Sequence, residues 1–389
     1  MSFIMQFIEK YFVFILQIYY HIDKKYISTL DKKTIYPLFT VIAIGFIALL
    51  TVSPAISSRI LISKYQLLMK QSIFIAMSIF LMIWIANKNQ ESLIFYSSIY
   101  FIFFTILLLC VLIFGTEIKG ASRWLGLGIF SIQPSEILKP FFVVINAQIL
   151  SSTKKIETQV YKSIVITSFL SLLLILEPDF GMMLLYCFTS AFQMFVAGIG
   201  LRFLSSVAIL LFLIFTATFL LIPHVRSRLL SFSGDENSYQ IKKALQSIYE
   251  GGFVGKGPGN GLIKYSLPDS HTDFIFSVIC EEFGYILAAI LLFIYFYIIF
   301  RNLFIAPLIS DLKRNILIVY GCIFIFMMQI FVNIGVNLRI LPNKGMTLPF
   351  ISYGGSALLG MGILFGIVLC LTKDIYKISN PYKKIYGPF

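Results

Sequence analysis

Charged residues are scarce in this chain of 389 residues, and their scarcity excludes an ordinary soluble protein. Only 13% of the residues are charged and 58% are hydrophobic, whereas roughly a quarter of a soluble domain is charged. Apolar runs of about 18 residues or more recur, and a helix needs roughly 20 such residues to cross a bilayer. The alternating segments of about ten residues that build a membrane β-barrel are absent. The sequence therefore predicts an all-α polytopic membrane protein.

Potential metal ligands and targeting signals are also sparse. The three histidines are scattered, and the five cysteines lie singly within apolar runs without a C-x-x-C pair. Such cysteines are typical of small buried hydrophobic residues, so no ligand set for a metal can be read. Residues 1–34 lack the layout of a cleavable signal peptide. We interpret them as a retained cytoplasmic lead-in to the membrane domain, residues 35–372.

Ten apolar segments predict about ten transmembrane helices. A polar, Gly-rich loop at residues 223–272 separates the seventh from the eighth. No internal repeat is evident, so an inverted-repeat transporter has no positive support. The predicted spans are residues 35–56, 72–87, 93–114, 135–151, 163–176, 181–199, 203–222, 273–300, 314–337 and 355–372.

Lysine and arginine are unevenly divided between the two sides of these spans. More of them lie on the side that carries both tails, and cytoplasmic segments of membrane proteins are enriched in lysine and arginine. This distribution accounts for the net charge of +13, so we expect membrane lipids and no nucleic acid as partners. The predicted topology places residues 1–34 and the tail, residues 373–389, in the cytoplasm. The 223–272 loop is then extracytoplasmic, and every unusual polar motif falls on the same outer side.

The first outer motif precedes and opens the fourth predicted span. Pro134 and Ser135 suit the start of a helix, and Glu136 is favourable in its first turn. Lys139 is expected a turn inside the membrane, three residues after Glu136, so the two side chains can pair. A structural ion pair and a site for an anion both remain open for Lys139.

The second outer motif is the Gly-rich loop and the aspartate that follows it. The glycines of residues 251–261 match neither phosphate-loop pattern, so they indicate tight turns. Asp273 opens the eighth span, where an Asp commonly caps the helix for about 1 kcal/mol. An ionisable residue at a membrane boundary is equally a functional hypothesis. Deeper in the span, Glu281 and Glu282 are expected to pair with a cation of a neighbouring helix or to line a wet cavity.

The third outer motif is a loop between the last two spans, residues 341–356. It contains two prolines and three glycines, which favour an irregular or re-entrant segment. Such backbone survives at membrane depth only where protein or water satisfies its polar groups.

Taken together and in order, these motifs resemble the SEDS family, which contains RodA, FtsW and SpoVE. The resemblance runs from about residue 40 to residue 372, and the run Lys344-Gly345-Met346-Thr347-Leu348-Pro349 is closer to the cell-division branch. Glu177 departs from the glutamine that is usual in the family. The motifs are Arg123-Trp124, Gln133-Pro134-Ser135-Glu136, Glu177-Pro178-Asp179-Phe180-Gly181, the stretch from Leu267-Pro268 to His271-Thr272-Asp273-Phe274, and the stretch from Leu348-Pro349-Phe350 to Ser352-Tyr353-Gly354-Gly355-Ser356.

The resemblance implies a ten-span SEDS fold and a peptidoglycan glycosyltransferase that polymerises lipid II. It implies a class B penicillin-binding protein, the septal transpeptidase, and other divisome proteins as partners in the bacterial inner membrane at the division septum. The family's essential loop aspartate, its proposed catalytic residue, matches Asp273.

The chemistry that this function requires suggests further site residues. A carboxylate can take the proton from the attacking sugar hydroxyl, and a single displacement inverts the anomeric centre as undecaprenyl pyrophosphate leaves. Cations must neutralise the charge on that leaving group. A divalent ion, Mg²⁺ or Mn²⁺, is left open for this role. The candidate substrate-binding residues are Lys139, Arg226, Arg228, Lys264, Glu136, His271 and Ser352.

Three alternatives share much of this evidence. A lipid II flippase would use the same substrate and cations but needs no base beside the sugar. A RodA-type polymerase would act in elongation, and a division scaffold would need no catalysis.

Overall fold

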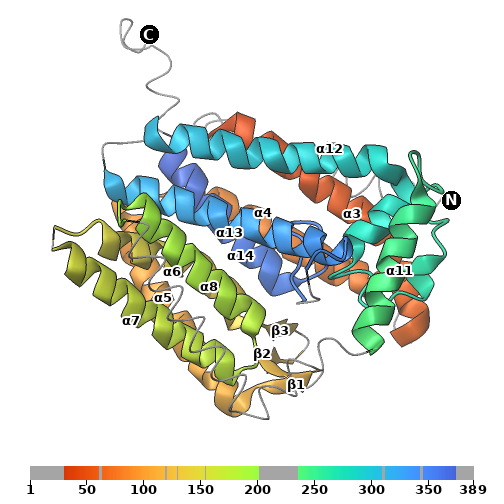
Figure 1. The fold of residues 1–389 in the computed structure, drawn as a ribbon, viewed down its shortest axis with the longest axis horizontal. Helices are drawn as coiled ribbons and strands as arrows, with labels where there is room; N and C mark the ends of the chain where they lie inside the picture. Colours follow the sequence, from red (N-terminus) through yellow and green to blue (C-terminus); the bar gives the residue numbers. More distant parts are fainter. Residues whose placement is uncertain are drawn as a thin grey trace, which may run out of the picture.

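The computed structural model describes residues 30–60, 64–118, 121–128, 130–153, 155–200, 235–308, 312–341 and 345–373. They form a helical bundle with a small sheet and one amphipathic helix at the same end (Figure 1). The helices are α3 (Lys32–Ile60), α4 (Lys64–Ala86), α5 (Gln90–Phe114), α6 (Pro134–Leu150), α7 (Ile156–Leu176), α8 (Phe180–Val196), α11 (Asp235–Gly251), α12 (Ile275–Ile305), α13 (Lys313–Asn337) and α14 (Gly355–Thr372), with 3₁₀ turns at Ile263–Tyr265 and Ala306–Leu308.

The all-α, polytopic prediction is confirmed for the described part of the chain. Seven of its helices are long and apolar enough to cross a membrane: α3, α4, α5, α7, α12, α13 and α14. The helices α6 and α8 are shorter, at 17 residues each. Every predicted span except residues 203–222 coincides with a helix, and that segment lies outside the described residues. The number of ten spans therefore stays a prediction.

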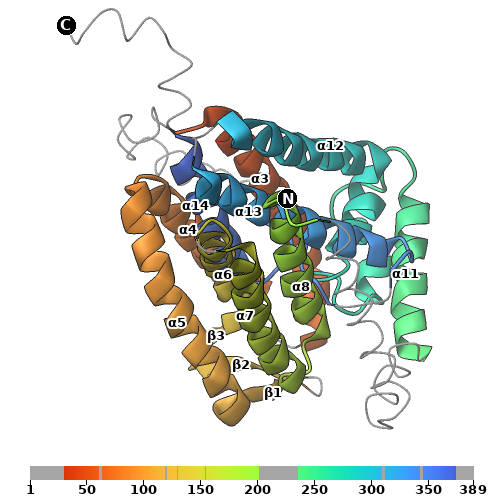
Figure 2. The same ribbon diagram turned by 60° about the vertical axis from the view of Figure 1, so that its left-hand side comes forward.

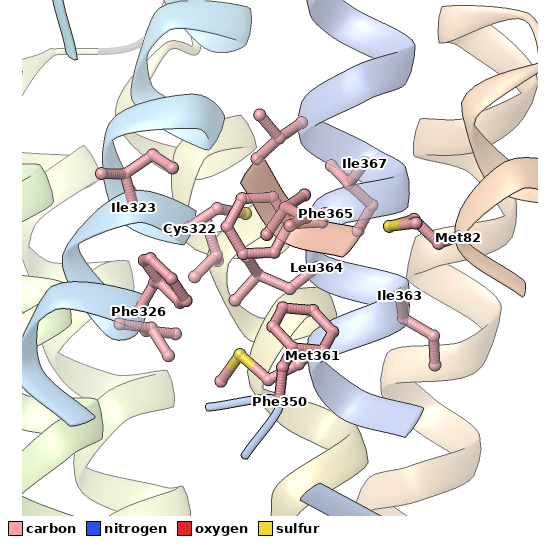
Figure 3. Close-up of a cluster of buried hydrophobic side chains, with 14 of the residues drawn as sticks. Met82, Cys322, Ile323, Phe326, Phe350, Met361, Ile363, Leu364, Phe365 and Ile367 are labelled. Carbon is pink, nitrogen blue, oxygen red and sulfur yellow. The ribbon is translucent and has the colours of Figure 1, made fainter. Parts of the chain in front are cut away.

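The core is centred on α14, which packs against α4 and α6. In α14, 89% of the 18-residue apolar segment is buried, whereas only 17% is buried in the corresponding segment of α5. Helix α5 therefore lies on the lipid-facing periphery. Figure 3 shows Phe365 of α14 among the side chains of this core. Its ring centroid lies 4.9 Å from that of Phe326 in α13 and 5.7 Å from that of Phe350. The loop that carries Phe350 is thus anchored on the centre of the bundle.

A three-stranded antiparallel sheet lies where the sequence predicted only a loop. Its strands are β1 (Thr116–Ile118), β2 (Ala121–Leu127) and β3 (Phe130–Ile132), in the order β1-β2-β3. The turn between β2 and β3 contains Gly128 at a φ of +67°, a conformation that glycine adopts without strain. Figure 2 shows the sheet beside the ends of α7 and α8, which run side by side. Strands of three residues give too weak a periodic signal to be read from the sequence.

The loop between α13 and α14 is irregular and buried, as predicted for its described residues 345–354. Leu348, Phe350 and Ile351 are all buried. The backbone amides of Ile351 and Ser352 donate to the carbonyl oxygen of Leu348, at 3.1 and 3.0 Å. Protein groups therefore satisfy this backbone at depth, as an apolar environment requires.

The Gly-rich loop lies along a break in α12. The break is at Gly284, whose φ of 78° and ψ of 178° are not helical and are essentially confined to glycine. The backbone amides of Tyr285 and Ile286 donate to the carbonyl oxygens of Gly252 and Phe253, at 2.9 and 3.2 Å. A Cβ on Gly284 would lie 2.3 Å from the Phe253 oxygen. Glycine is required here because two backbones meet.

Candidate active site

Asp273 lies just before α12, at the end of the bundle that carries the sheet. It is half-buried. The helix begins at Ile275, so the capping position belongs to Phe274, whose side chain makes no capping bond. The amide of Ser277 donates instead to Oδ1 of Asn337, at 3.2 Å. The interpretation of Asp273 as the N-cap is therefore wrong, because a side chain of α13 takes that role.

The main chain of Asp273 is held from α13. Its carbonyl oxygen accepts hydrogen bonds from Nδ2 of Asn333 at 3.0 Å and from Nδ2 of Asn337 at 2.9 Å. Its carboxylate lies beside Gly345 in the next loop, where an added Cβ would come within 3.4 Å of Oδ2. The carboxylate thus sits at the junction of two loops, the one before α12 and the one between α13 and α14.

The structure brings His271 and Ser352 to the same junction. The amide of Tyr353 donates to the carbonyl oxygen of His271 at 2.8 Å, and the two rings lie 5.5 Å apart. The Ser352 hydroxyl donates to the Thr272 carbonyl oxygen at 2.6 Å and accepts from the Leu348 amide at 2.7 Å. Ser352 therefore joins the two loops, and its single hydroxyl hydrogen is already engaged.

A second group of polar side chains, here called the polar cluster, comes from β2, the start of α6 and the turn between α7 and α8. Nη1 of Arg123 is 3.7 Å from Oδ1 of Asp179, and Nε2 of Gln133 donates to Oδ2 of Asp179 at 3.2 Å. Burial raises the pKa of Asp179, while the Arg123 charge lowers it. The members of the polar cluster are Arg123, Gln133, Glu136, Lys139, Glu177 and Asp179.

Lys139 and Glu136 form a buried ion pair within the polar cluster. Lys139 is fully buried in α6, so the predicted pairing is confirmed. The amide of Gln133 donates to Oγ of Ser356 in α14 at 2.9 Å, and a Cβ on Gly360 would lie 2.4 Å from the Glu136 carbonyl oxygen. The first turns of α14 therefore pack directly against the start of α6, beside this cluster.

Glu177 is the most unusual titratable group of the polar cluster. Its side chain is 1% exposed, and neither carboxylate oxygen has a hydrogen-bond partner among the described residues. Burial, reinforced by the neighbouring Asp179 charge and opposed by Arg123, raises its pKa to about 8. The protonated form of Glu177 therefore predominates at neutral pH. The sequence signalled this site only by the departure from glutamine.

Lys264 is buried in a structural contact and is not available for a pyrophosphate. Its Nζ donates to the carbonyl oxygens of Thr51 at 2.8 Å and Gly259 at 3.0 Å, and to Oε1 of Glu282 at 2.5 Å. An ammonium group has three donors, so all of them are engaged. The prediction of Lys264 as a substrate ligand is wrong, because the Gly-rich loop folds back onto α12.

The two glutamates of α12 fix this loop. Glu281 accepts the amides of Leu262 and Ile263 at Oε1, at 2.8 and 3.0 Å, and lies 3.5 Å from Nζ of Lys256. Both glutamates therefore pair with lysines of the loop, whereas one prediction expected a cation of a neighbouring helix. Backbone amides and lysines together satisfy the buried charges.

Two predicted cations and the metal site remain without structural support. Arg226 and Arg228 lie outside the described residues. Within the described ranges, no group of three His, Cys, Asp or Glu side chains is arranged to hold a metal ion. No metal ligand is assigned.

Comparison with known proteins identifies the family. Residues 32–377 match the profile of the family FtsW/RodA/SpoVE, described as "Cell cycle protein". The chain belongs to this family. The predicted SEDS membership is thereby confirmed for most of the chain.

Relatives of this FtsW/RodA/SpoVE family member carry the name of the cell-division branch. A "Probable peptidoglycan glycosyltransferase FtsW" from Francisella salina is 32% identical over 379 residues, which cover 92% of this chain and 94% of the relative. A protein of the same name from Caulobacter vibrioides is 35% identical over 263 residues, 67% of each chain. The predicted likeness to the cell-division branch is therefore confirmed.

Solved structures of FtsW/RodA/SpoVE family members share the fold. One, described as "Structural coordination of polymerization and crosslinking by a peptidoglycan synthase complex", matches with a TM-score of 0.74 and 27% identity over 90% of this chain and 99% of that one. The rod shape determining protein RodA of Thermus thermophilus matches with a TM-score of 0.67 and 26% identity over 89% of this chain and 98% of its own.

Proposed function

We propose that this chain is a peptidoglycan glycosyltransferase that polymerises lipid II at the division septum. Family membership and the relatives named FtsW support the activity. The observation that carries the proposal is the half-buried Asp273 carboxylate, whose main chain is tied to α13 at the junction of two outer loops. A general base must be held in a fixed position to act, and the hydrogen bonds from α13 hold the main chain of Asp273.

The reaction transfers a glycan from a lipid pyrophosphate to a sugar hydroxyl. Asp273 accepts the hydroxyl proton as the oxygen attacks the anomeric carbon, and the carbon–pyrophosphate bond breaks with inversion. Positive charge stabilises the leaving pyrophosphate. Arg226 and Arg228 of the 223–272 loop are the proposed cations; Lys139 is fully buried and paired with Glu136, so it is not assigned this role.

We further propose that the protein acts in the inner membrane with a class B penicillin-binding protein. One solved relative is described as a peptidoglycan synthase complex that coordinates polymerisation and crosslinking, and a crosslinking partner would act on the same outer face. The helices alternate in direction, so the junction at Asp273, the polar cluster and the Gly-rich loop share one end of the bundle (Figure 1). We infer that this end is extracytoplasmic.

The catalytic assignment is tested by Asp273→Asn in the full-length protein with its transpeptidase partner and labelled lipid II. Asn preserves the volume but cannot accept a proton, so glycan synthesis should fall by roughly 10²- to 10⁴-fold. Glu250→Gln, which removes an exposed carboxylate from the neighbouring α11, is the matched control and should keep wild-type activity. Wild-type polymerisation by well-folded Asp273→Asn protein would refute the assignment. Loss of lipid II translocation with polymerisation intact would support a flippase instead.

The topology is tested by single cysteines in a background without the native ones. Tyr249→Cys at the exposed end of α11 should react with an impermeant reagent in spheroplasts. Thr153→Cys, in the exposed turn between α6 and α7, should react only after lysis. The opposite labelling pattern would invert the proposed orientation.

A further inference from the structure

A stripe of three amide side chains runs along the buried face of α13. Gln329, Asn333 and Asn337 are spaced four residues apart, which places them above one another on one side of a helix. All three are buried. Buried amides are costly unless their donors and acceptors are satisfied, so the partners of each indicate what it does.

Asn333 connects two loops that are distant in the sequence. Its Nδ2 donates to the carbonyl oxygen of Asp273 at 3.0 Å and to that of Met346 at 2.7 Å. An amide nitrogen has two hydrogens, and both are used. The segment before α12 is thereby tied to the loop after α13, with Gly345 beside the Asp273 carboxylate.

Asn337 supports the same carbonyl from one turn further along. Its Nδ2 donates to the carbonyl oxygen of Asp273 at 2.9 Å. Its Oδ1 accepts from the Ser277 amide at 3.2 Å and from the Ser277 hydroxyl at 2.6 Å. A carbonyl oxygen accepts two hydrogen bonds, so the two asparagines fill the capacity of the Asp273 carbonyl.

Fixing the main-chain carbonyl of Asp273 restricts the positions that the side chain of Asp273 can reach. The Asp273 carboxylate is separated from its Cα by one methylene, so its reach is set by the backbone position. A misplacement of roughly 1 Å at a reacting group can cost about 10²-fold in rate. The hydrogen bonds from α13 therefore bear on the rate of the reaction as well as on the fold.

We propose that Asn333 and Asn337 are positioning residues, which hold the Asp273 carboxylate for proton transfer through its main-chain carbonyl. This inference rests on the proposed function, in which Asp273 is the base. It assigns to α13 a part in the reaction without contact to the substrate. Asn333 has the larger part, because it also holds the facing loop through Met346.

The test is Asn333→Leu in the full-length protein with its transpeptidase partner. The substitution keeps the branching of the side chain and removes both donors. We expect kcat for lipid II polymerisation to fall by about 10- to 100-fold, with KM within twofold of wild type. Asn333→Ser, which keeps one donor, should lie between wild type and Asn333→Leu, and it replaces Asn333→Leu if that variant does not fold.

Two controls separate positioning from simple stability. Gln329→Leu also replaces a buried amide by an apolar side chain one turn away, where neither amide atom has a partner among the described residues, and should keep the wild-type kcat. Ser277→Ala removes a hydrogen bond to Asn337 Oδ1 without altering the donors to Asp273, so it lowers thermal stability and leaves kcat unchanged. An equal fall in kcat for Ser277→Ala and the Asn333 variants would overturn the proposal.

Asp273→Asn, measured alongside, distinguishes the two possible failures. An inactive Asp273→Asn protein together with a wild-type kcat in both Asn333 variants would refute the positioning role and leave the proposed function intact. An active Asp273→Asn protein would refute the proposed function, and the positioning role with it.

Discussion

The wild-type protein should become less stable as the pH rises, because Glu177 must ionise in a buried site. Replacing Glu177 by glutamine should remove this pH-dependent loss. Folding raises the pKa of Glu177 from 4.5 to about 8, because the side chain is buried beside Asp179. Between these pH values the unfolded chain releases a proton that the folded chain retains. Stability therefore falls as the pH rises through this window, and the whole penalty is present above pH 8. Below pH 4.5 the protonated acid and the amide should behave alike.

The size of the effect follows from the same two values. Each pH unit of difference is worth about 1.4 kcal/mol, so the difference between about 8 and 4.5 corresponds to about 5 kcal/mol. The side chain is almost inaccessible to solvent, so solvent screening reduces this figure little. Glutamine keeps the shape of the protonated acid but cannot ionise. Glu177→Gln should therefore be more stable than the wild type by a few kcal/mol at pH 9.

Thermal unfolding in nanodiscs at pH 5 and pH 9 measures this difference directly. The wild type should lose more thermal stability between these pH values than Glu177→Gln. Glu91→Gln, whose parent side chain is 78% exposed, controls for loss of a carboxylate and should follow the wild type. The same pH dependence in Glu177→Gln and in the wild type would refute the argument.

Two further predictions concern the buried ion pairs. Lys264→Met should destabilise the protein by about 3 to 5 kcal/mol, because Glu282 is left buried without its cation, and adding Glu282→Gln should recover most of the loss. Denaturation of the single and double variants measures this, and equal stability of both would contradict it. Lys139→Met should likewise be rescued in stability by Glu136→Gln. Because Lys139 is buried and paired with Glu136, lipid II polymerisation should recover together with stability in that double variant. A rate that stays about tenfold or more below wild type would show that Lys139 also acts on the leaving group.

The helices were predictable from the sequence, but most partners of the polar residues were not. Long apolar runs determine α12 and α13, because only a helix satisfies its own backbone in lipid. Lys264 looked like a free cation in a polar loop, and only the return of that loop onto α12 pairs it with Glu282. Asn333 and Asn337 were visible at the end of a span, but their partners are backbone carbonyls. Such acceptors carry no residue identity, so no pattern of residue types could reveal them.

The junction at Asp273 was predictable only through the family resemblance. Thr272 and Ser352 are joined by a hydrogen bond across 80 residues, and nothing in their spacing brings them together. The small sheet was missed because β1 and β3 are three residues long. Glu177 is the opposite case, because its departure from the family pattern marked the position although its burial could not be read.

The break at Gly284 sets how much of α12 faces lipid. The helix has 31 residues, and an unbroken helix of that length would be about 46 Å long. This exceeds the roughly 30 Å of a bilayer's hydrocarbon core and would call for a steep tilt or a locally thickened membrane. Residues 275–282 are instead coated by protein, and exposed apolar side chains begin at Ile286 and continue at Phe293. The part after the break is roughly 30 Å long, which is about the thickness of the hydrocarbon core. Because the Gly-rich loop covers the residues before the break, only a membrane-length part of α12 has to face lipid.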